Sequence, residues 1–276
     1  MCDRKSTPTP FSELPAESRA GFYALLANAW RYPDESFAGC FLRPSGVDAL
    51  LKGLDELPAC LADKVKDLRE LVSRLSRTPL ADLLSRLQAE FVRLFGHSVR
   101  GSCPPYELEF GRGEIIQQTA ELADLAGFYS AFGLNLTEAA YERADHVAVE
   151  CEFLSVLCAK EAWGRQNDNH DLSETCADAQ RLFLRDHLAK WLPAYAHRVE
   201  AADSEGFYGR AASLASAFIR EECRRFEIEV GPQWLELCPA DPERDSMIDC
   251  DTAGCGDAGE NRLIQLGIDA RSGSAR

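Results

Sequence analysis

The stretch 145–163, DHVAVECEFLSVLCAKEAW, decides the fold class of this chain. Asp145 at its start is a suitable helix N-cap, because a short carboxylate can accept from the first free backbone N–H groups. Side chains at the three- and four-residue spacing of one helical face follow: His146, Val149, Glu150, Phe153, Leu154 and Leu157. The pattern predicts a helix from Asp145 to Trp163 with one largely apolar face.

The same periodicity recurs over most of the chain. It predicts helices over residues 17–32, 47–57, 65–75, 80–95, 122–132, 184–195 and 207–218, and Pro193 is expected to kink the sixth of these. Gly96 is placed to end the fourth. No alternating strand pattern of useful length and no internal repeat occurs. The predicted fold class is therefore all-α, a single globular helical bundle.

The two ends of the chain differ in composition from its middle. Residues 1–15 are polar and proline-containing, so we expect a flexible N-terminal arm. From residue 238 onward the sequence is rich in Asp, Gly and Pro with few large apolar residues, which is typical of a mostly disordered acidic tail. The predicted helical domain covers residues 16–237, and the tail covers 238–276.

The net charge limits the class of partner. The 276 residues carry 30 Lys and Arg against 45 Asp and Glu, a formal net charge of −15. This excess opposes binding to nucleic acid or to an anionic membrane, and it favours a basic peptide, although an acidic balance also simply keeps a protein soluble. No apolar run is long enough for a signal peptide or a membrane span. We therefore expect a cytoplasmic protein without membrane insertion.

Motifs for catalysis and cofactor binding are missing from the sequence. It contains no GxxxxGK[ST], GxGxxG, HExxH or GxSxG, and its five histidines are not spaced as metal-ligand pairs. The 11 cysteines include no CxxC, so we expect reduced thiols, mostly in the core. A metal site at Cys238, Cys250 and Cys255 is a weak alternative. The prediction is no catalytic residue, no metal, no cofactor and no enzymatic activity.

A loop that carries both aromatic and acidic side chains is predicted over residues 96–113, GHSVRGSCPPYELEFGRG. Tyr106 and Phe110 offer apolar contact area, and Glu107 and Glu109 offer negative charge, so the loop suits a peptide with apolar and basic side chains. The alternative is a loop that packs on the core with its acids solvated.

Two further segments carry polar residues of interest. We expect Asp145 and His146 to act at the surface, beside the loop that precedes their helix. Glu150 lies on an otherwise apolar face, where a carboxylate is costly unless it is paired, either with His146 or with another helix. In the run 124–134, DLAGFYSAFGL, we expect Phe128, Tyr129 and Phe132 in the core and Asp124 at the surface.

Together these segments resemble the TorD/DmsD/NarJ family of redox-enzyme maturation chaperones. The family has an E-x-P-D-H-like element before a helix with E-x-E-F, and here Glu142-Arg-Ala-Asp-His146 precedes Glu150-Cys-Glu-Phe153, with Ala144 where proline is usual. CPPYELEFG at 103–111 is similar to an element of the branch that serves type II dimethyl-sulfoxide-reductase-like enzymes. The run 124–134 is similar to a helix of the family, and the likeness covers about residues 20–230.

The resemblance implies a chaperone that binds the apo catalytic subunit of a molybdopterin-guanine-dinucleotide oxidoreductase, through its twin-arginine leader, its body or both. Such a chaperone assists cofactor insertion and delays export, as a monomer or homodimer. The implied client-binding residues are Tyr106, Glu107, Glu109, Phe110, Asp124, Glu142, Asp145 and His146, with the acids as partners of arginine. Glu150, Phe128, Tyr129 and Phe132 are implied to be structural. A guanine-nucleotide-binding helical protein and an assembly scaffold without leader specificity stay open as alternatives.

Overall fold

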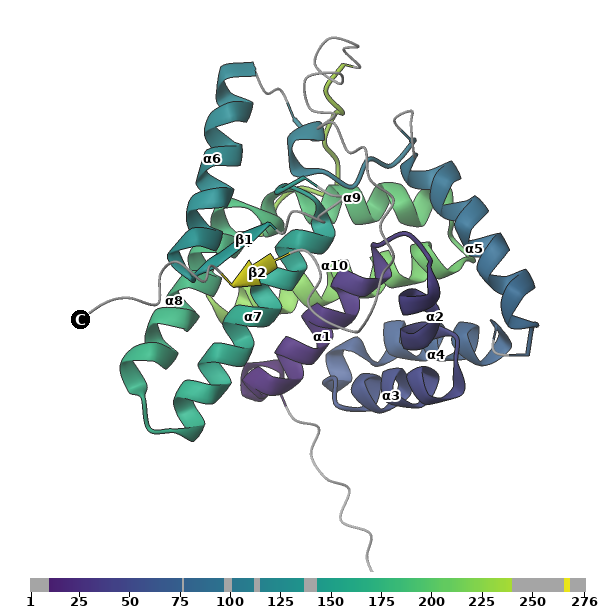
Figure 1. The fold of residues 1–276 in the computed structure, drawn as a ribbon, viewed down its shortest axis with the longest axis horizontal. Coiled ribbons are helices and arrows are strands. Elements are labelled where there is room, and N and C mark those ends of the chain that lie inside the picture. Colours follow the sequence, from purple (N-terminus) through teal and green to yellow (C-terminus); the bar gives the residue numbers. More distant parts are fainter. Residues whose placement is uncertain are drawn as a thin grey trace, which may run out of the picture.

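Ten α-helices make up most of the regular structure in the computed structural model (Figure 1). The structure describes residues 10–75, 77–96, 101–111, 115–136, 143–239 and 266–268. The helices are α1 Ala16–Ala29, α2 Glu35–Phe41, α3 Pro44–Asp55, α4 Ala62–Leu75, α5 Leu80–Phe95, α6 Ile115–Ala131, α7 Val147–Gln166, α8 His170–Asp186, α9 Leu188–Ala202 and α10 Phe207–Arg225. The predicted all-α fold class is confirmed.

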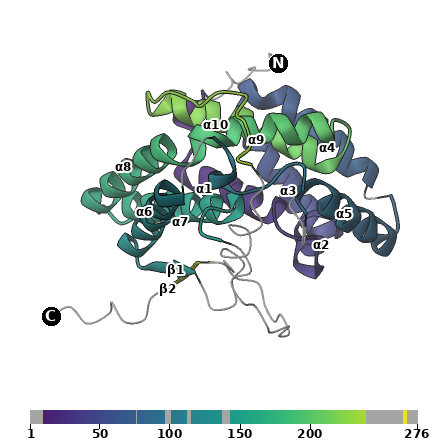
Figure 2. The same cartoon turned by 90° about the horizontal axis from the view of Figure 1, so that it is seen from above.

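Helix α7, the helix of the opening stretch, lies at the centre of the bundle. It packs against α1 and α8, while α10 packs against α9 and α4. Figures 1 and 2 show α6 and α8 at one end of the molecule and α2 to α5 at the other. Residues 147–154 of α7 are all buried, because neighbours surround this part of the helix. The apolar stripe predicted from the sequence is therefore only part of its buried surface.

Several helix boundaries differ from the predicted ones for local reasons. Helix α2 was not predicted, although Asp34 caps it by accepting from the Phe37 N–H at 2.9 Å. The predicted helix over 184–195 is instead the end of α8 and the start of α9, which meet at His187 with φ −129° and ψ −103°. Helix α5 ends at Phe95 as expected, and Gly96 follows it with φ +87°, a conformation that favours glycine.

Aromatic contacts attach α6 to the bundle. Phe128 and Phe132 are partly buried and Tyr129 is buried. All three rings contact Phe153 of α7, with centroids 5.0–6.4 Å apart. The Tyr129 hydroxyl also donates to the Ala144 carbonyl at 2.7 Å, which positions the chain just before α7.

A buried charge cluster joins α1 to α7, α8 and α10. Arg19 has no exposed surface. Its guanidinium contacts Glu161 at 2.6 Å, Gln180 at 2.6 Å and Glu222 at 3.4 Å, so one side chain links four helices. Arg19 is not among the residues that the sequence predicts to be functional or structural. Arg19 lies one turn before Phe22 on the apolar face of α1. A charged residue at such a position indicates that it is buried and paired with acidic side chains.

The ends of the chain contribute more to the described structure than their composition suggested. Of the predicted arm, Phe11 and Leu14 are buried in the core, and Phe11 contacts Phe218. Of the predicted tail, residues 266–268 form strand β2, which pairs antiparallel with β1, Leu134–Leu136. The remaining parts of both segments, residues 1–9, 240–265 and 269–276, lie outside the described residues.

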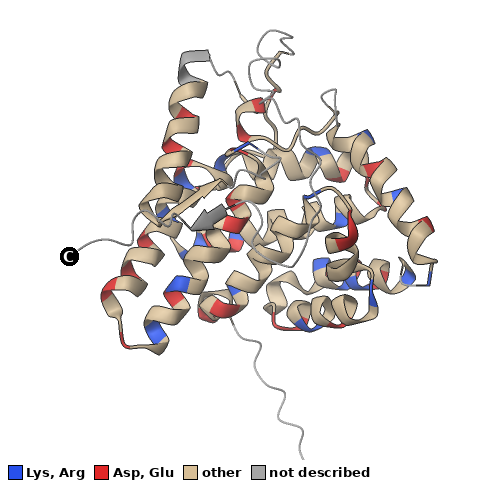
Figure 3. Cartoon of the chain, in the orientation of Figure 1, with Lys and Arg blue, Asp and Glu red and all other residues tan. Residues whose placement is uncertain are grey.

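The negative charge is spread over the molecule. Figure 3 shows acidic residues on helices at both ends of the bundle. Among the described helices, none is long and apolar enough to cross a membrane. The eight described cysteines are free, and most are buried, as expected for core thiols.

Candidate client-binding site

The loop around Tyr106 lies directly against the start of α7. Tyr106 and His146 form an antiparallel bridge. The Val147 N–H donates to the Pro105 carbonyl, and the Glu107 N–H donates to the Asp145 carbonyl, both at 2.9 Å. The two segments, which only the family resemblance had linked, are therefore joined by backbone hydrogen bonds.

The opposite edge of this loop is held by the chain that follows α10. The Gly111 N–H donates to the Glu236 carbonyl at 2.8 Å, and the Cys238 N–H donates to the Glu109 carbonyl at 2.9 Å. The Cys238 thiol contacts the Gly111 carbonyl at 3.0 Å. Within the described ranges, no group of three or more His, Cys, Asp or Glu is placed to hold a metal ion. Cys250 and Cys255 lie outside those ranges.

Asp145 is buried, not at the surface as expected, and it is not the N-cap of α7. Its carboxylate accepts the Leu108 N–H at 3.2 Å. Arg143 binds the same carboxylate with two parallel contacts, Nε to Oδ1 at 2.9 Å and Nη2 to Oδ2 at 2.7 Å. Asp145 is fully buried because these donors replace its hydration.

His146 is also buried, with 1% of its surface exposed, which corrects its expected surface position. It takes the N-cap role predicted for Asp145, because its Nδ1 accepts the Ala148 N–H at 3.0 Å. Its ring packs against Tyr106 with centroids 5.1 Å apart. The helix start is thus one residue later than expected, and His146 joins it to the loop.

His187, at the α8–α9 junction, connects two carboxylates. Its Nδ1 lies 3.1 Å from Glu107 Oε2, and its Nε2 lies 3.2 Å from Asp124 Oδ2. A neutral imidazole has one N–H, so both contacts are hydrogen bonds only when a second proton resides on the ring or on a carboxyl group. Burial raises the pKa of Glu107, and the hydrogen bond from His187 partly offsets that rise. Asp124, by contrast, is exposed, as expected.

Glu150 of α7 is fully buried near Glu107 and Asp145. Its carboxylate accepts the indole N–H of Trp191 on α9 at 3.2 Å, so the partner from another helix, and not His146, satisfies it. Burial, and next the negative charges of Glu107 and Asp145, raise the pKa of Glu150 well above its ordinary value. A proton held on Glu150 therefore lowers the repulsion inside the cluster.

Glu150→Gln tests this raised pKa through the pH dependence of stability. The amide oxygen still accepts from Trp191, but the side chain no longer ionises. In the wild type, the unfolded carboxyl ionises first as the pH rises, so each pH unit between the unfolded and folded pKa values costs about 1.4 kcal/mol of stability relative to the variant. Urea unfolding between pH 4 and 8 measures the difference. A constant offset at all pH values would contradict the assignment, and exposed Glu70→Gln is the control.

The remaining predicted residues lie around the same place. Tyr106 and Phe110 are half-buried. The guanidinium of Arg143 lies 4.6 Å above the Tyr106 ring, and Phe110 packs on Trp191 with centroids 5.3 Å apart. Glu109 is buried, and its Oε1 lies 3.8 Å from Arg143 Nη1. The loop therefore packs on the core, as the alternative expected, but Glu107 and Glu109 are buried and not solvated as that alternative expected. Glu142 lies outside the described residues.

Three residues of this site were missed from the sequence: Arg143, His187 and Trp191. Arg143 stood in a variable position of the family element. His187 lies one turn after Leu184 and one turn before Trp191 in an apolar stripe. A histidine within such a stripe was the signal that a polar partner would be needed nearby.

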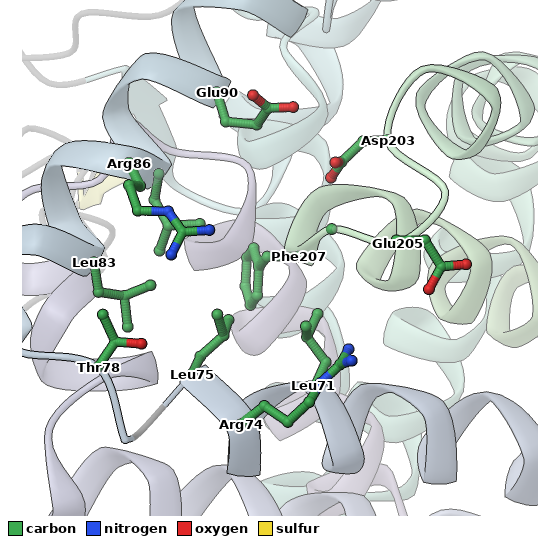
Figure 4. A pocket seen from close by; sticks show the side chains of 12 residues that line it. Leu71, Arg74, Leu75, Thr78, Leu83, Arg86, Glu90, Asp203, Glu205 and Phe207 are labelled. Carbon is green, nitrogen blue, oxygen red and sulfur yellow. The ribbon is translucent and has the colours of Figure 1, made fainter.

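A separate pocket of about 500 Å³ lies between α4, α5 and the start of α10 (Figure 4). Leu71, Leu75 and Phe207 are among its apolar lining residues, and Arg74 and Arg86 also line it. None of the predicted client-binding residues lines this pocket. The acidic site is instead a contact network between the loop, α6, α7 and the α8–α9 junction.

Comparison with known proteins gives one family model and several named relatives. The family model described as nitrate reductase delta subunit matches residues 55–197, just over half of the chain. The chaperone protein TorD of Vibrio cholerae is 33% identical over 181 residues, covering 64% of this chain and 77% of that protein. A perchlorate reductase assembly chaperone protein of Dechloromonas aromatica is 28% identical over 73% of this chain and 87% of its own length.

A chlorate reductase assembly chaperone protein of Ideonella dechloratans is 35% identical over 141 residues, which cover 48% of this chain and 68% of that protein. The residues matched by the family model, 55–197, include the loop, the start of α7 and the α8–α9 junction described above. The chain belongs to the TorD/DmsD/NarJ family of redox-enzyme maturation chaperones.

Proposed function

We propose that this protein is a chaperone that binds the apo catalytic subunit of a molybdopterin-guanine-dinucleotide oxidoreductase by its twin-arginine leader. It assists cofactor insertion and delays export until insertion is complete, and it does this in the cytoplasm as a binding protein without catalytic activity. The observation that carries the proposal is the joining of an acidic, aromatic loop to the Asp145–His146 element. The names of the perchlorate and chlorate reductase assembly chaperones support an oxidoreductase as the client.

The chemistry of the site suits a guanidinium-bearing peptide. Five carboxyl groups lie close together on the loop, on α6, just before α7 and in α7: those of Glu107, Glu109, Asp124, Asp145 and Glu150. Two basic side chains, Arg143 and His187, contact all of them except Glu150. A guanidinium binds carboxylates in a planar fork and stacks on aromatic faces. Tyr106 and Phe110 provide half-buried aromatic surface beside the acids, where the apolar part of a leader can pack.

Asp124→Asn tests the exposed carboxylate of the site, because the Asp124 side chain is 62% exposed and an asparagine of the same size can keep the contact with His187. We expect the variant to bind a synthetic twin-arginine leader peptide up to about fivefold more weakly, as loss of an exposed charge contact costs up to about 1 kcal/mol. We also expect wild-type affinity to fall as salt is raised from 50 to 300 mM, because exposed charges are screened. Isothermal titration calorimetry measures both effects.

The matched control is Asp178→Asn, because Asp178 is an exposed aspartate on α8 whose side chain is 73% accessible. This control should bind like the wild type. Absence of binding by the wild-type protein, or an affinity that neither salt nor Asp124→Asn changes, would contradict the proposed function.

A further inference from the structure

We propose that Arg143 occupies the arginine position of the binding site in the free chaperone, and that a client arginine replaces it. The inference rests on the proposed function, and it adds a specific competitor that lies within the chain itself. The site is thereby defined as a guanidinium site, whose ligand is an arginine side chain and not any basic group.

The contacts of Arg143 include each feature of guanidinium recognition. Its Nε and Nη2 form the two-point fork with Asp145 at 2.9 and 2.7 Å. Its Nη1 lies 3.8 Å from a second carboxylate, that of Glu109. Its guanidinium carbon lies 4.6 Å from the centroid of the Tyr106 ring, within cation–π range. Asp145, Glu109 and Tyr106, which are expected to bind an arginine of the client, therefore already bind Arg143.

The arrangement allows exchange of the side chain. Arg143 precedes α7, which begins at Val147, so its side chain can rotate away without breaking a helical turn. The side chain remains 19% exposed, whereas that of Asp145 is fully buried. The Leu108 N–H also holds the Asp145 carboxylate, so one donor remains when Arg143 moves away and a client guanidinium can replace the others. The residues that hold the guanidinium are therefore positioned by the loop and by the start of α7, and not by Arg143 itself.

An internal competitor weakens the apparent affinity for the client, because only the molecules whose site is open can bind. The apparent Kd is the intrinsic Kd divided by the fraction of open molecules. It also raises selectivity, since a lysine gives a point charge without the planar fork and displaces Arg143 poorly. We therefore expect weak binding of single basic residues and stronger binding of peptides whose paired arginines and apolar segment make additional contacts.

The first experiment compares affinities for a twin-arginine leader peptide and its twin-lysine counterpart. We expect Arg143→Gln to bind the arginine peptide about tenfold more tightly than the wild type, and Arg143→Lys to lie between them, because each removes part of the competition. Arg43→Gln, which removes an exposed arginine paired with Glu35, controls for net charge and should change nothing. Unchanged or weaker binding by folded Arg143→Lys would overturn the inference.

The second experiment needs no client. Arg143→Ala leaves a cavity beside Asp145 that ethylguanidinium should fill. We expect millimolar ethylguanidinium to raise the melting temperature of Arg143→Ala, while ethylammonium does not, and neither compound should raise that of the wild type. Absence of a selective rise would overturn the guanidinium site. If ethylguanidinium rescues the variant but no protein binds the leader peptide, the proposed function fails while the assignment of the site stands.

Discussion

Arg19→Ala is expected to lower the free energy of unfolding by about 3–5 kcal/mol, because it removes one partner from a buried charge cluster. Glu161 and Glu222 would be left without the guanidinium that contacts them at 2.6 and 3.4 Å. Both carboxylates are fully buried, so water cannot replace the lost contacts in the intact bundle. Urea unfolding followed by circular dichroism measures the change.

Two matched variants give this prediction its control. Arg43→Ala removes an arginine whose ion pair with Glu35 is exposed, and it should cost less than about 1 kcal/mol. Arg19→Met keeps most of the side-chain volume, so it separates the loss of charge from the loss of packing. A cost below about 1 kcal/mol for both Arg19 variants would show that the cluster does not hold α1 in place.

The second large effect concerns Asp145→Ala, which we expect to destabilise the protein by about 3 kcal/mol and to abolish leader binding, because a buried charge pair loses one partner. Arg143 loses its fork and the Leu108 N–H loses its acceptor, so the loop keeps its backbone hydrogen bonds to the start of α7 but loses the side-chain contacts that reinforce them. Thermal unfolding and calorimetric titration at a temperature where the variant stays folded measure the two effects.

The control for Asp145→Ala is Asp186→Ala, which removes an aspartate from its ion pair with Arg185 near the end of α8. It should cost less than about 1 kcal/mol, since both side chains of that pair are partly exposed to solvent. Normal stability of Asp145→Ala combined with lost binding would mean that Asp145 contacts only the client. Normal binding combined with lost stability would remove Asp145 from the proposed site.

Most of the helices were predictable because each buries an apolar face, and the spacing of that face is visible in the sequence. The helix boundary at His187 could not be predicted from the sequence, because Leu184 and Leu188 keep helical spacing across it. The residue at the break contacts Glu107 and Asp124, which lie 80 and 63 residues away in the chain. Contacts of such separation leave no local periodicity.

Polar residues of the site were recognised by type but not by burial. Asp145 and His146 were expected at the surface because an aspartate and a histidine at a helix start are ordinarily solvated. Their burial depends on donors and packing from Arg143, Leu108 and Tyr106, which only the folded arrangement brings together. For Glu150, the cost of an unpaired buried carboxylate did predict a partner, although the sequence could not identify Trp191.

The attachment of the loop to residues 236–238 has a consequence for biosynthesis. The carbonyl of Glu236 and the N–H of Cys238 form one edge of the loop that carries Glu107 and Glu109. A ribosome must therefore translate beyond α10 before this loop has both of its supports. The nascent chain therefore completes the support of this loop only after α1 to α10 have been translated.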